Sequence, residues 1–392
     1  MNECPFDLAF YSFFHAPTGY GMAGRGYLRA FDRAGIPVSA VPIGQRRIGP
    51  VTDPILAKSM GRRKLPRLHL WHSEPEDLRA VINFLPELIV LTTWEADRIS
   101  ELYAKVLNHA REVWVPCRYN EEAFRRQLTV PVRRIPHPVD ELAPEDVNLS
   151  AFNRKMHLQD DDFVVVSVGT WQQRKNLEGS LEAFCKAFGD EPRAHFILKT
   201  SLTFMDFQMV QMQVLQVLER IPERYRYSLF QRIHLHTELW GREQMAALRA
   251  RTDCYLTLHR GEGWCYPAFE AACMGKPVVS TGYSGPLDFL DARHHHLVGY
   301  KLIPADQSKQ KLRFGFTSNM QWADPDVDEA ARALRRVFEH YGQCRALAGE
   351  AAAEIRTKFS LEAVGRQARE YLEAIDAPAE GRQETYDALC AC

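Results

Sequence analysis

The chain has 392 residues, of which 46% are hydrophobic and 25% are charged. This composition is typical of a soluble globular protein and excludes a disordered or fibrous one, and the length predicts two domains. No apolar run is long enough to span a bilayer, and the N-terminus lacks the basic flank of a signal peptide. The nine cysteines form no C-x-x-C pair, which favours reduced thiols and a cytoplasmic protein.

Along the chain, short β-rich runs alternate with longer helical patterns. In the first half, strands are predicted at FDLAFY (6–11), IPVSAVPI (36–43), LIVLTT (88–93) and EVWVP (112–116), with a helix over 22–34. The prolines of IPHPVDELAPEDVNLSAFNRK (135–155) then interrupt any regular element and predict a domain boundary.

The same alternation restarts in the second half. Strands are predicted at FVVVSV (163–168), HFILKT (195–200), RIHLHT (232–237), CYLTLH (254–259) and PVVST (277–281). Helices are predicted over 176–188, 207–218, 243–250, 328–339 and 361–375, and a further one over the stretch GEGWCYPAFE (261–270).

Continuous apolar strands separated by helices indicate parallel sheets covered on both faces. The sequence therefore predicts an α/β protein with two Rossmann-like domains. We expect an N-terminal domain over 1–140, a second domain over 141–358, a C-terminal helix over 359–377 and a tail over 378–392.

Two loops of the second domain directly follow predicted strands, which is where open parallel sheets bind ligands. GTWQQRKN (169–176) supplies Arg174 and Lys175, which could neutralise a diphosphate, although two solvated cations are the simpler interpretation of that loop alone. In GEGWCYPAFE, Pro267 suits the first turn of a helix, so Glu262 lies in the loop and Glu270 about one turn into the helix. Carboxylates beside large apolar residues are costly to bury unless they are paired, which favours a functional pair over surface acids.

No metal site is predicted. Asp160–Asp162 resembles a D-x-D metal motif but precedes a strand instead of ending one, so we expect a polar turn there.

The stretch GEGWCYPAFEAACMGKPVVSTGYSGPLDFL (261–290) resembles the E-x7-E region of retaining glycosyltransferases with the GT-B fold, glycosyltransferase family 4. Other stretches resemble that family in the same order along the chain: GYGMAGRGYLRAF (19–31), TTWEADRI (92–99), EVWVPCRYNEEAF (112–124), IPHPVD (135–140), VGTWQQRKNLEGSLEAF (168–184) and QWADPDVDEAARAL (321–334). Many members have an arginine directly after the glycine of the 169–176 loop and a histidine late in the first domain, where this chain has Thr170 and Trp94–Glu95.

The resemblance implies that the two domains face each other across a cleft and that the C-terminal helix returns to the first domain. It also implies roles for particular residues. Glu270 would bind the ribose of a nucleotide-sugar donor, and Glu262 would face the transferred sugar. Arg174 and Lys175 would bind the diphosphate. The remaining donor contacts would come from two loops, Gly263, Trp264, Cys265 and Tyr266 in the second domain and Gly19, Tyr20 and Gly21 in the first.

The implied activity is metal-independent, retaining transfer of a hexose from a UDP- or GDP-linked sugar to an acceptor hydroxyl, in the synthesis of a polysaccharide, lipopolysaccharide or glycolipid. The nucleotide sugar is a substrate, and no cofactor is expected. Both a front-face route and a double displacement through Glu262 stay open. The alternatives are a glycosyltransferase that acts on modified DNA bases and a catalytically idle nucleotide-sugar-binding protein.

Charge is unevenly distributed: residues 1–140 carry +4 and the remainder −5. Residues 44–68 contain seven cations, Arg46, Arg47, Lys58, Arg62, Arg63, Lys64 and Arg67, against Asp53 alone. A solvated loop explains such a run, and so does an anionic carbohydrate or lipid-linked acceptor, or peripheral contact with the inner face of a membrane.

Overall fold

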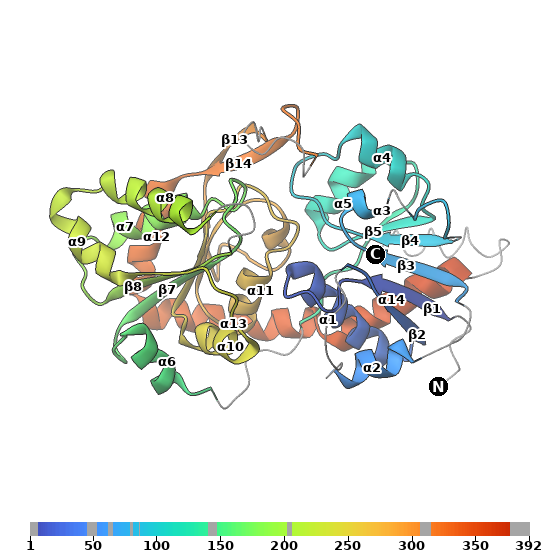
Figure 1. Cartoon of the computed structure of the whole chain (residues 1–392), viewed down its shortest axis with the longest axis horizontal. Coiled ribbons are helices and arrows are strands. Elements are labelled where there is room, and N and C mark those ends of the chain that lie inside the picture. The colour runs from blue at the N-terminus through green and yellow to red at the C-terminus, as the bar shows by residue number, and fades with distance from the viewer. Residues whose placement is uncertain are drawn as a thin grey trace. The chain divides into compact units, whose positions relative to one another are not determined.

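The chain divides into two compact units in the computed structural model (Figure 1), which describes residues 7–44, 53–61, 66–78, 81–85, 87–139, 147–201, 206–305 and 315–376. The first unit comprises 1–94, 98–140 and 357–392, and the second comprises 95–97 and 141–356. The second half of the chain thus stays in one unit until residue 356, after which the chain returns to the first unit.

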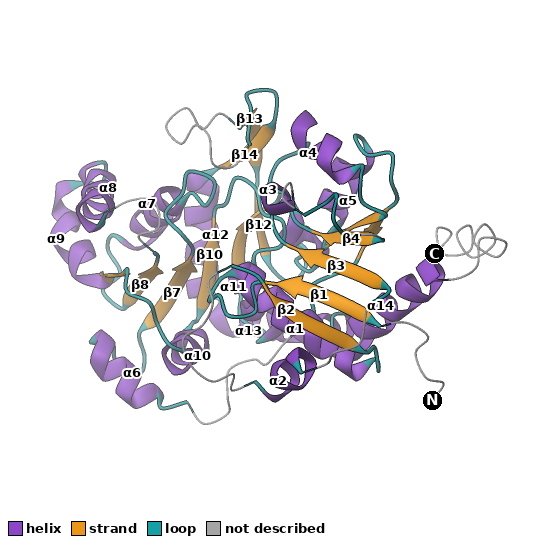
Figure 2. Ribbon diagram, turned by 45° about the vertical axis from the view of Figure 1, so that its right-hand side comes forward, coloured by secondary structure: helices purple, strands orange, loops and turns teal. Residues whose placement is uncertain are grey.

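A parallel sheet forms the centre of the first unit, with strand order β2-β1-β3-β4-β5-β6 (Figure 2). Its strands are β1 (Leu8–Ser12), β2 (Val38–Pro42), β3 (Leu68–His72), β4 (Leu88–Leu91), β5 (Glu112–Val115) and β6 (Val132–Arg134). The helices before the boundary are α1 (Gly19–Arg33), α2 (Pro54–Met60), α3 (Pro75–Leu78), α4 (Glu101–Leu107) and α5 (Arg118–Arg125). β3, β4 and β5 are buried at every position, as expected for parallel strands that are covered on both faces.

The C-terminal helix α14 (Leu361–Asp376) packs against α1 of the first unit, which confirms its predicted return. Ser360 caps it, since the Ser360 hydroxyl accepts a hydrogen bond from the Ala363 N–H at 3.1 Å. Gly365 permits the close approach of the two helices: a Cβ atom at this position would lie 2.1 Å from the carbonyl oxygen of Ala30.

We expect Gly365→Ala to lower the free energy of unfolding by about 1–3 kcal/mol, because the methyl group must push a backbone carbonyl aside. Gly349→Ala is the matched control, since a Cβ there would meet nothing within 4 Å. That change should be neutral or stabilise the chain by up to about 1 kcal/mol. Denaturant unfolding of both variants checks the prediction, and equal effects would contradict the close packing of α14 on α1.

The second unit contains another parallel sheet, with strand order β12-β11-β10-β7-β8-β9. Its strands are β7 (Phe163–Val168), β8 (Ala194–Lys199), β9 (Ile233–His236), β10 (Cys254–Thr257), β11 (Val278–Thr281) and β12 (His296–Val298). A separate antiparallel hairpin pairs β13 (Tyr300–Pro304) with β14 (Gln321–Pro325). The two parallel sheets confirm the predicted pair of Rossmann-like folds.

The helices of the second unit are α6 (Leu149–Met156), α7 (Leu177–Phe188), α8 (Phe207–Glu219), α9 (Glu223–Arg232), α10 (Arg242–Arg251), α11 (Tyr266–Cys273), α12 (Val327–Glu339) and α13 (Tyr341–Lys358), with a 3-10 turn at Gly285–Asp288. Helices α7, α8 and α12 bury apolar side chains against one face of the sheet, among them Phe184, Val210 and Leu334. The loops that follow β7 and β10 at the carboxyl edge of this sheet contain the residues of the predicted donor site.

Candidate functional site

Asn176 fixes the loop after β7, residues 169–176, to the start of α7. Its backbone has φ 48°, and its side chain accepts a hydrogen bond from the Gly179 N–H. The Asn176 amide also donates to the carbonyl oxygen of Leu258 at 2.9 Å. Because Leu258 directly follows β10, one side chain connects the two loops of the predicted donor site.

Glu262 is 4% exposed and pairs with both cations of the 169–176 loop. Its Oε1 lies 2.5 Å from the Nζ of Lys175, and its Oε2 lies 3.2 Å from the Nη1 of Arg174. Burial by itself raises the pKa of the Glu262 carboxyl, but the charges of Lys175 and Arg174 outweigh this effect and lower the pKa to about 2. Glu262 is therefore an ionised carboxylate held by two cations.

Glu95 is a fourth charged group of this cluster, and the sequence did not identify it as a partner. The segment Glu95–Asp97 belongs to the second unit, and Glu95 Oε1 lies 3.3 Å from the Nη2 of Arg174. The Glu95 carbonyl oxygen accepts a hydrogen bond from the Trp322 indole at 2.9 Å. Burial raises the pKa of Glu95, against the effect of Arg174. Two carboxylates thus balance the two cations of the loop.

Ser284 and Gly285 brace the backbone around Glu262 from the start of the 3-10 turn. The Ser284 hydroxyl accepts a hydrogen bond from the Glu262 N–H at 3.0 Å, and the Gly285 N–H donates to the Glu262 carbonyl at 2.9 Å. A Cβ on Gly285 would lie 2.5 Å from the carbonyl oxygen of Gly263, so only glycine fits there. The S-G-P tripeptide was the available sequence signal for this brace.

Positive φ angles in non-glycine residues concentrate around Glu262. Asn176 has φ 48°, Cys265 has φ 72° and Ser284 has φ 62°. Such conformations cost about 1–3 kcal/mol each for residues other than glycine and cluster at ligand-binding sites. Strained backbone here is consistent with a site shaped for a ligand.

The residues from Gly263 to Tyr266 lead into α11. Trp264 is buried, with its ring 5.1 Å from that of Phe269 and 5.2 Å from that of Phe289. Pro267 lies in the first turn of α11, as predicted. The aromatic packing fixes the loop, and the N-terminus of α11 provides the kind of backbone environment that binds anions.

Glu270 lies in α11, away from the Glu262 cluster, and pairs with a different cation. Its Oε1 is 3.3 Å from the Nη1 of Arg249 on α10. A cavity of about 20 Å³ lies beside this pair and is also lined by Val168 and Tyr255. The Nε of Arg249 is buried without a hydrogen-bond partner among the described residues. The E-x7-E spacing therefore places the two glutamates in two separate ion-pair groups.

The predicted glycine loop of the first unit forms the start of α1. Thr18 caps the helix, and a Cβ on Gly21 would lie 2.0 Å from the carbonyl oxygen of Ala16. The Tyr20 hydroxyl is 3.1 Å from that of Thr93, after β4. Gly19, Tyr20 and Gly21 thus lie at the carboxyl edge of their own sheet, and their role in donor binding stays a prediction.

Five of the seven cations of the basic run over 44–68 lie outside the described residues: Arg46, Arg47, Arg62, Arg63 and Lys64. Within the described part, Lys58 pairs with Asp32 at 2.9 Å, and Asp53 pairs with Arg29 at 2.8 Å. These contacts give no test of an anionic partner.

No group of three or more potential metal ligands occurs among the residues that the structure describes. Over the same residues, none of the helices is both long and apolar enough to cross a membrane.

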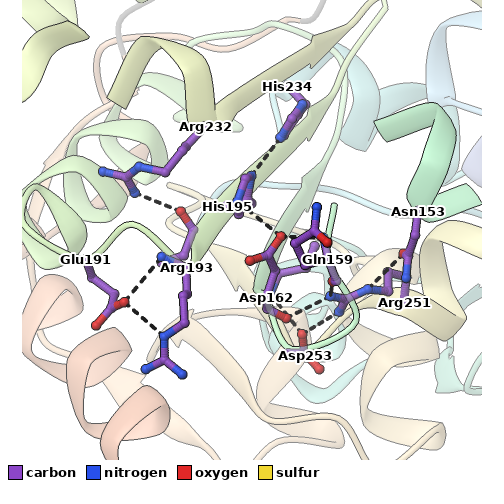
Figure 3. A network of polar contacts seen from close by, with 12 residues as sticks. Asn153, Gln159, Asp162, Glu191, Arg193, His195, Arg232, His234, Arg251 and Asp253 are labelled. Atoms are coloured by element: carbon purple, nitrogen blue, oxygen red, sulfur yellow. Dashed lines mark hydrogen bonds and ion pairs between the residues drawn. The ribbon is translucent and has the colours of Figure 1, made fainter. Parts of the chain in front are cut away.

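A second polar network lies at the opposite, amino edge of the second sheet (Figure 3). Arg251 donates to the carbonyl oxygen of Asp162 at 2.7 Å and pairs with Asp253 at 2.7 Å. His195 Nδ1 lies 3.0 Å from His234 Nε2, and His195 Nε2 lies 3.3 Å from Asp162. Asp162 is thus part of a structural network, as its position before a strand predicts.

This network makes the unfolding free energy depend on pH. Burial and the neighbouring His195 lower the pKa of His234 to about 4, below its usual value near 6.5. His234 therefore binds a proton more readily in the unfolded chain than in the folded one. Its contribution to the free energy of unfolding is fully present above pH ~6.5 and decreases as the pH falls toward ~4. Between pH ~6.5 and ~4, the free energy of unfolding measured with denaturant should fall by about 1–3 kcal/mol less in His234→Gln than in the parent chain. An unchanged pH profile would contradict a half-buried, neutral His234.

Residues 150–312 match the family described as Glycosyl transferases group 1. None of the curated proteins is similar enough to match the chain.

Several solved structures share the fold. One is Alr3699/HepE from Anabaena in complex with UDP and glucose, with 15% identity over 94% of this chain and 100% of that one and a TM-score of 0.65. Another is sucrose-phosphate synthase from Thermosynechococcus elongatus, with 15% identity over 94% and 98% of the two chains and a TM-score of 0.65. The pneumococcal O-GlcNAc transferase GtfA, in complex with UDP and GlcNAc, shows 12% identity over 79% and 56%, with a TM-score of 0.54. Identities this low establish the fold alone.

The family match covers the segment that contains Glu262, Glu270 and the two cations of the 169–176 loop, Arg174 and Lys175, which we call the clamp cations. The two Rossmann-like units and the return of α14 to α1 are the arrangement of the GT-B fold. Residues 150–312 therefore resemble the glycosyl transferases group 1 family, and the chain has the GT-B fold.

Proposed function

We propose that the chain is a retaining glycosyltransferase that transfers a hexose from a UDP-sugar to an acceptor hydroxyl. The observation that carries the proposal is the position of Lys175, Arg174 and Glu262 at the carboxyl edge of the second sheet, beside the N-terminus of α11. We favour UDP over GDP as the donor nucleotide because HepE and GtfA were both solved with UDP.

In this proposal the donor lies along the two loops of the second unit. Glu270 binds the ribose hydroxyls through its carboxylate oxygens, beside Arg249. Lys175 and Arg174 shift part of their hydrogen bonding from Glu262 to the diphosphate. Glu262 then faces the sugar and stabilises positive charge near the anomeric carbon.

The ion pairs of Glu262 favour a front-face route over a double displacement. A carboxylate with a pKa of about 2, held by two cations, is a weak nucleophile. In the front-face route the bond between the anomeric carbon and the phosphate oxygen breaks. The acceptor oxygen bonds to the same face of the sugar, and its proton passes to the leaving phosphate.

The test is incubation of the chain with UDP- and GDP-linked hexoses while nucleotide release and the anomeric proton of the sugar product are followed by NMR. The proposal predicts UDP release and a product with the donor's anomeric configuration. An inverted product would contradict retention. Binding of UDP-sugars without release, with a range of carbohydrate acceptors, would favour the idle binding protein.

Transfer is expected to continue after chelation of divalent metals, because Arg174, Lys175 and the N-terminus of α11 supply the charge that stabilises the leaving diphosphate. Activity measured after treatment with excess chelator should stay within about twofold of the untreated rate. Complete loss that magnesium or manganese restores would contradict this prediction.

The acceptor belongs to the proposal as well. A carbohydrate or lipid-linked acceptor in polysaccharide, lipopolysaccharide or glycolipid synthesis fits the hydroxyl chemistry. The seven cations of 44–68 favour an anionic one, at the cytoplasmic face of a membrane.

A further inference from the structure

Lys199, at the carboxyl end of β8, is a buried cation. It is 7% exposed, and its ammonium group donates to the carbonyl oxygen of Thr200 at 2.8 Å. Its Nζ lies 5.7 Å from the centre of the Trp240 ring, and it forms no ion pair with any residue that the structure describes. Burial lowers the pKa of Lys199, and Glu238 acts against this effect. Burying this charge lowers the stability of the fold, whereas an apolar side chain at this position would be buried without that loss.

Lys199 lies beside the 169–176 loop, on the face of the sheet that lines the cavity next to Glu270. Val168 and Lys199 are paired in the parallel register of β7 and β8, so their side chains leave the same face. Val168 also lines the cavity beside Glu270. The Gly169 N–H donates to the Lys199 carbonyl at 3.0 Å, and the hydroxyls of Ser201 and Thr170 are 3.3 Å apart.

Two further polar groups at this position have no hydrogen-bond partner in the part of the chain that the structure describes. Thr200 is only 2% exposed, and its hydroxyl oxygen, Oγ1, has no hydrogen-bond partner among the described residues. The Nε2 of His236, at the end of the neighbouring β9, is also buried without a hydrogen-bond partner among the described residues. Buried polar atoms are nearly always satisfied, so unsatisfied ones beside an unpaired ammonium point to a ligand.

The two cations of the 169–176 loop already have carboxylate partners, so a further cation would add to the charge that they offer a diphosphate. Arg174 and Lys175 face two carboxylates, Glu262 and Glu95, and their charges therefore balance before any diphosphate binds. Arg249 is likewise paired with Glu270. A diphosphate gains negative charge as its bond to the sugar breaks, and a cation without a carboxylate partner stabilises that charge most effectively.

We propose that Lys199 binds a phosphate group of the nucleoside diphosphate donor, with the Thr200 hydroxyl as a second ligand of the same group. The assignment rests on the proposed function. It adds a donor-binding residue on β8 to the two cations of the 169–176 loop.

The experiment compares Lys199→Met, Lys199→Arg and the unchanged chain in calorimetric titrations with UDP and with uridine. Lys199→Met should raise the Kd for UDP at least tenfold and leave the Kd for uridine unchanged, because uridine has no phosphate. Lys199→Arg should retain most of the UDP affinity. Thermal unfolding of the methionine variant should occur at the parent temperature or above, since an apolar side chain replaces a buried charge.

Thr200→Val removes the hydroxyl but keeps the side-chain shape and Lys199, and it should weaken UDP binding several-fold. This variant tests the site even if Lys199→Met fails to fold. Unchanged UDP affinity in both Lys199→Met and Thr200→Val would overturn the assignment, and so would an equal loss of uridine and UDP affinity. The proposed function fails separately, if the unchanged chain binds neither UDP nor any UDP-sugar.

Discussion

Lys175→Met is expected to lower sugar transfer about 10²–10³-fold and the free energy of unfolding by about 3 kcal/mol. The reason is that Glu262 is 4% exposed and loses its closest cation, at 2.5 Å, while Arg174 remains at 3.2 Å. A buried carboxylate without adequate compensation destabilises the native state. Donor turnover and denaturant unfolding of the same preparation measure the two effects.

The double variant Lys175→Met/Glu262→Gln separates stability from activity. Removing the carboxylate charge together with the lysine should restore the unfolding free energy to within about 1 kcal/mol of the parent, while transfer stays lost. Lys175→Arg should retain the charge and most of the stability. Parent-like stability of Lys175→Met alone would show that the pair with Glu262 does not hold the loop.

Glu270→Ala is expected to raise the Kd for UDP about 10- to 100-fold, which corresponds to about 1.5–3 kcal/mol for hydrogen bonds to a charged group. Arg249, whose Nε already lacks a partner, also loses its carboxylate at 3.3 Å, so a modest loss of stability should accompany the change. Calorimetric titration with UDP measures the affinity.

Glu243→Ala is the matched control for Glu270→Ala, because Glu243 is an exposed acid in the first turn of α10, the helix that contains Arg249. Its removal should leave UDP affinity unchanged. Glu270→Gln, which keeps an acceptor oxygen, should lie between the parent and the alanine variant. Equal UDP affinity for Glu270→Ala and the parent, in a folded chain, would remove Glu270 from the site.

The fold was largely predictable because its strands are apolar and its helices are amphipathic. The predicted helix over 207–218 is α8 (Phe207–Glu219), and the one over 361–375 is α14 (Leu361–Asp376). Helix α13 (Tyr341–Lys358) was missed, since two glycines and a run of alanines give it no clear apolar stripe. The hairpin of β13 and β14 was missed because several positions of β13 are exposed, so it lacks the apolar signature of the buried strands.

The candidate site was predicted in its residues but not in its contacts. Spacing identified Glu262, Glu270 and the two clamp cations, but it could not show that Lys175 and Glu262, 87 positions apart, form an ion pair. The contacts of Glu95, Arg249 and Ser284 were not predicted, since each is set by tertiary packing that the local sequence does not encode. A local pattern encodes helix position and loop chemistry, whereas pairing partners are set by the folded backbone.

Hydrogen–deuterium exchange with and without UDP tests the central claim most directly, because ligand binding protects the backbone that it orders. The account predicts slower exchange in two loops of the second unit, residues 169–176 and 261–270, and a loss of that protection in Glu270→Ala. Saturating UDP that leaves exchange in both loops unchanged, or that protects only segments of the first unit, would contradict a donor site built on Lys175, Glu262 and Glu270.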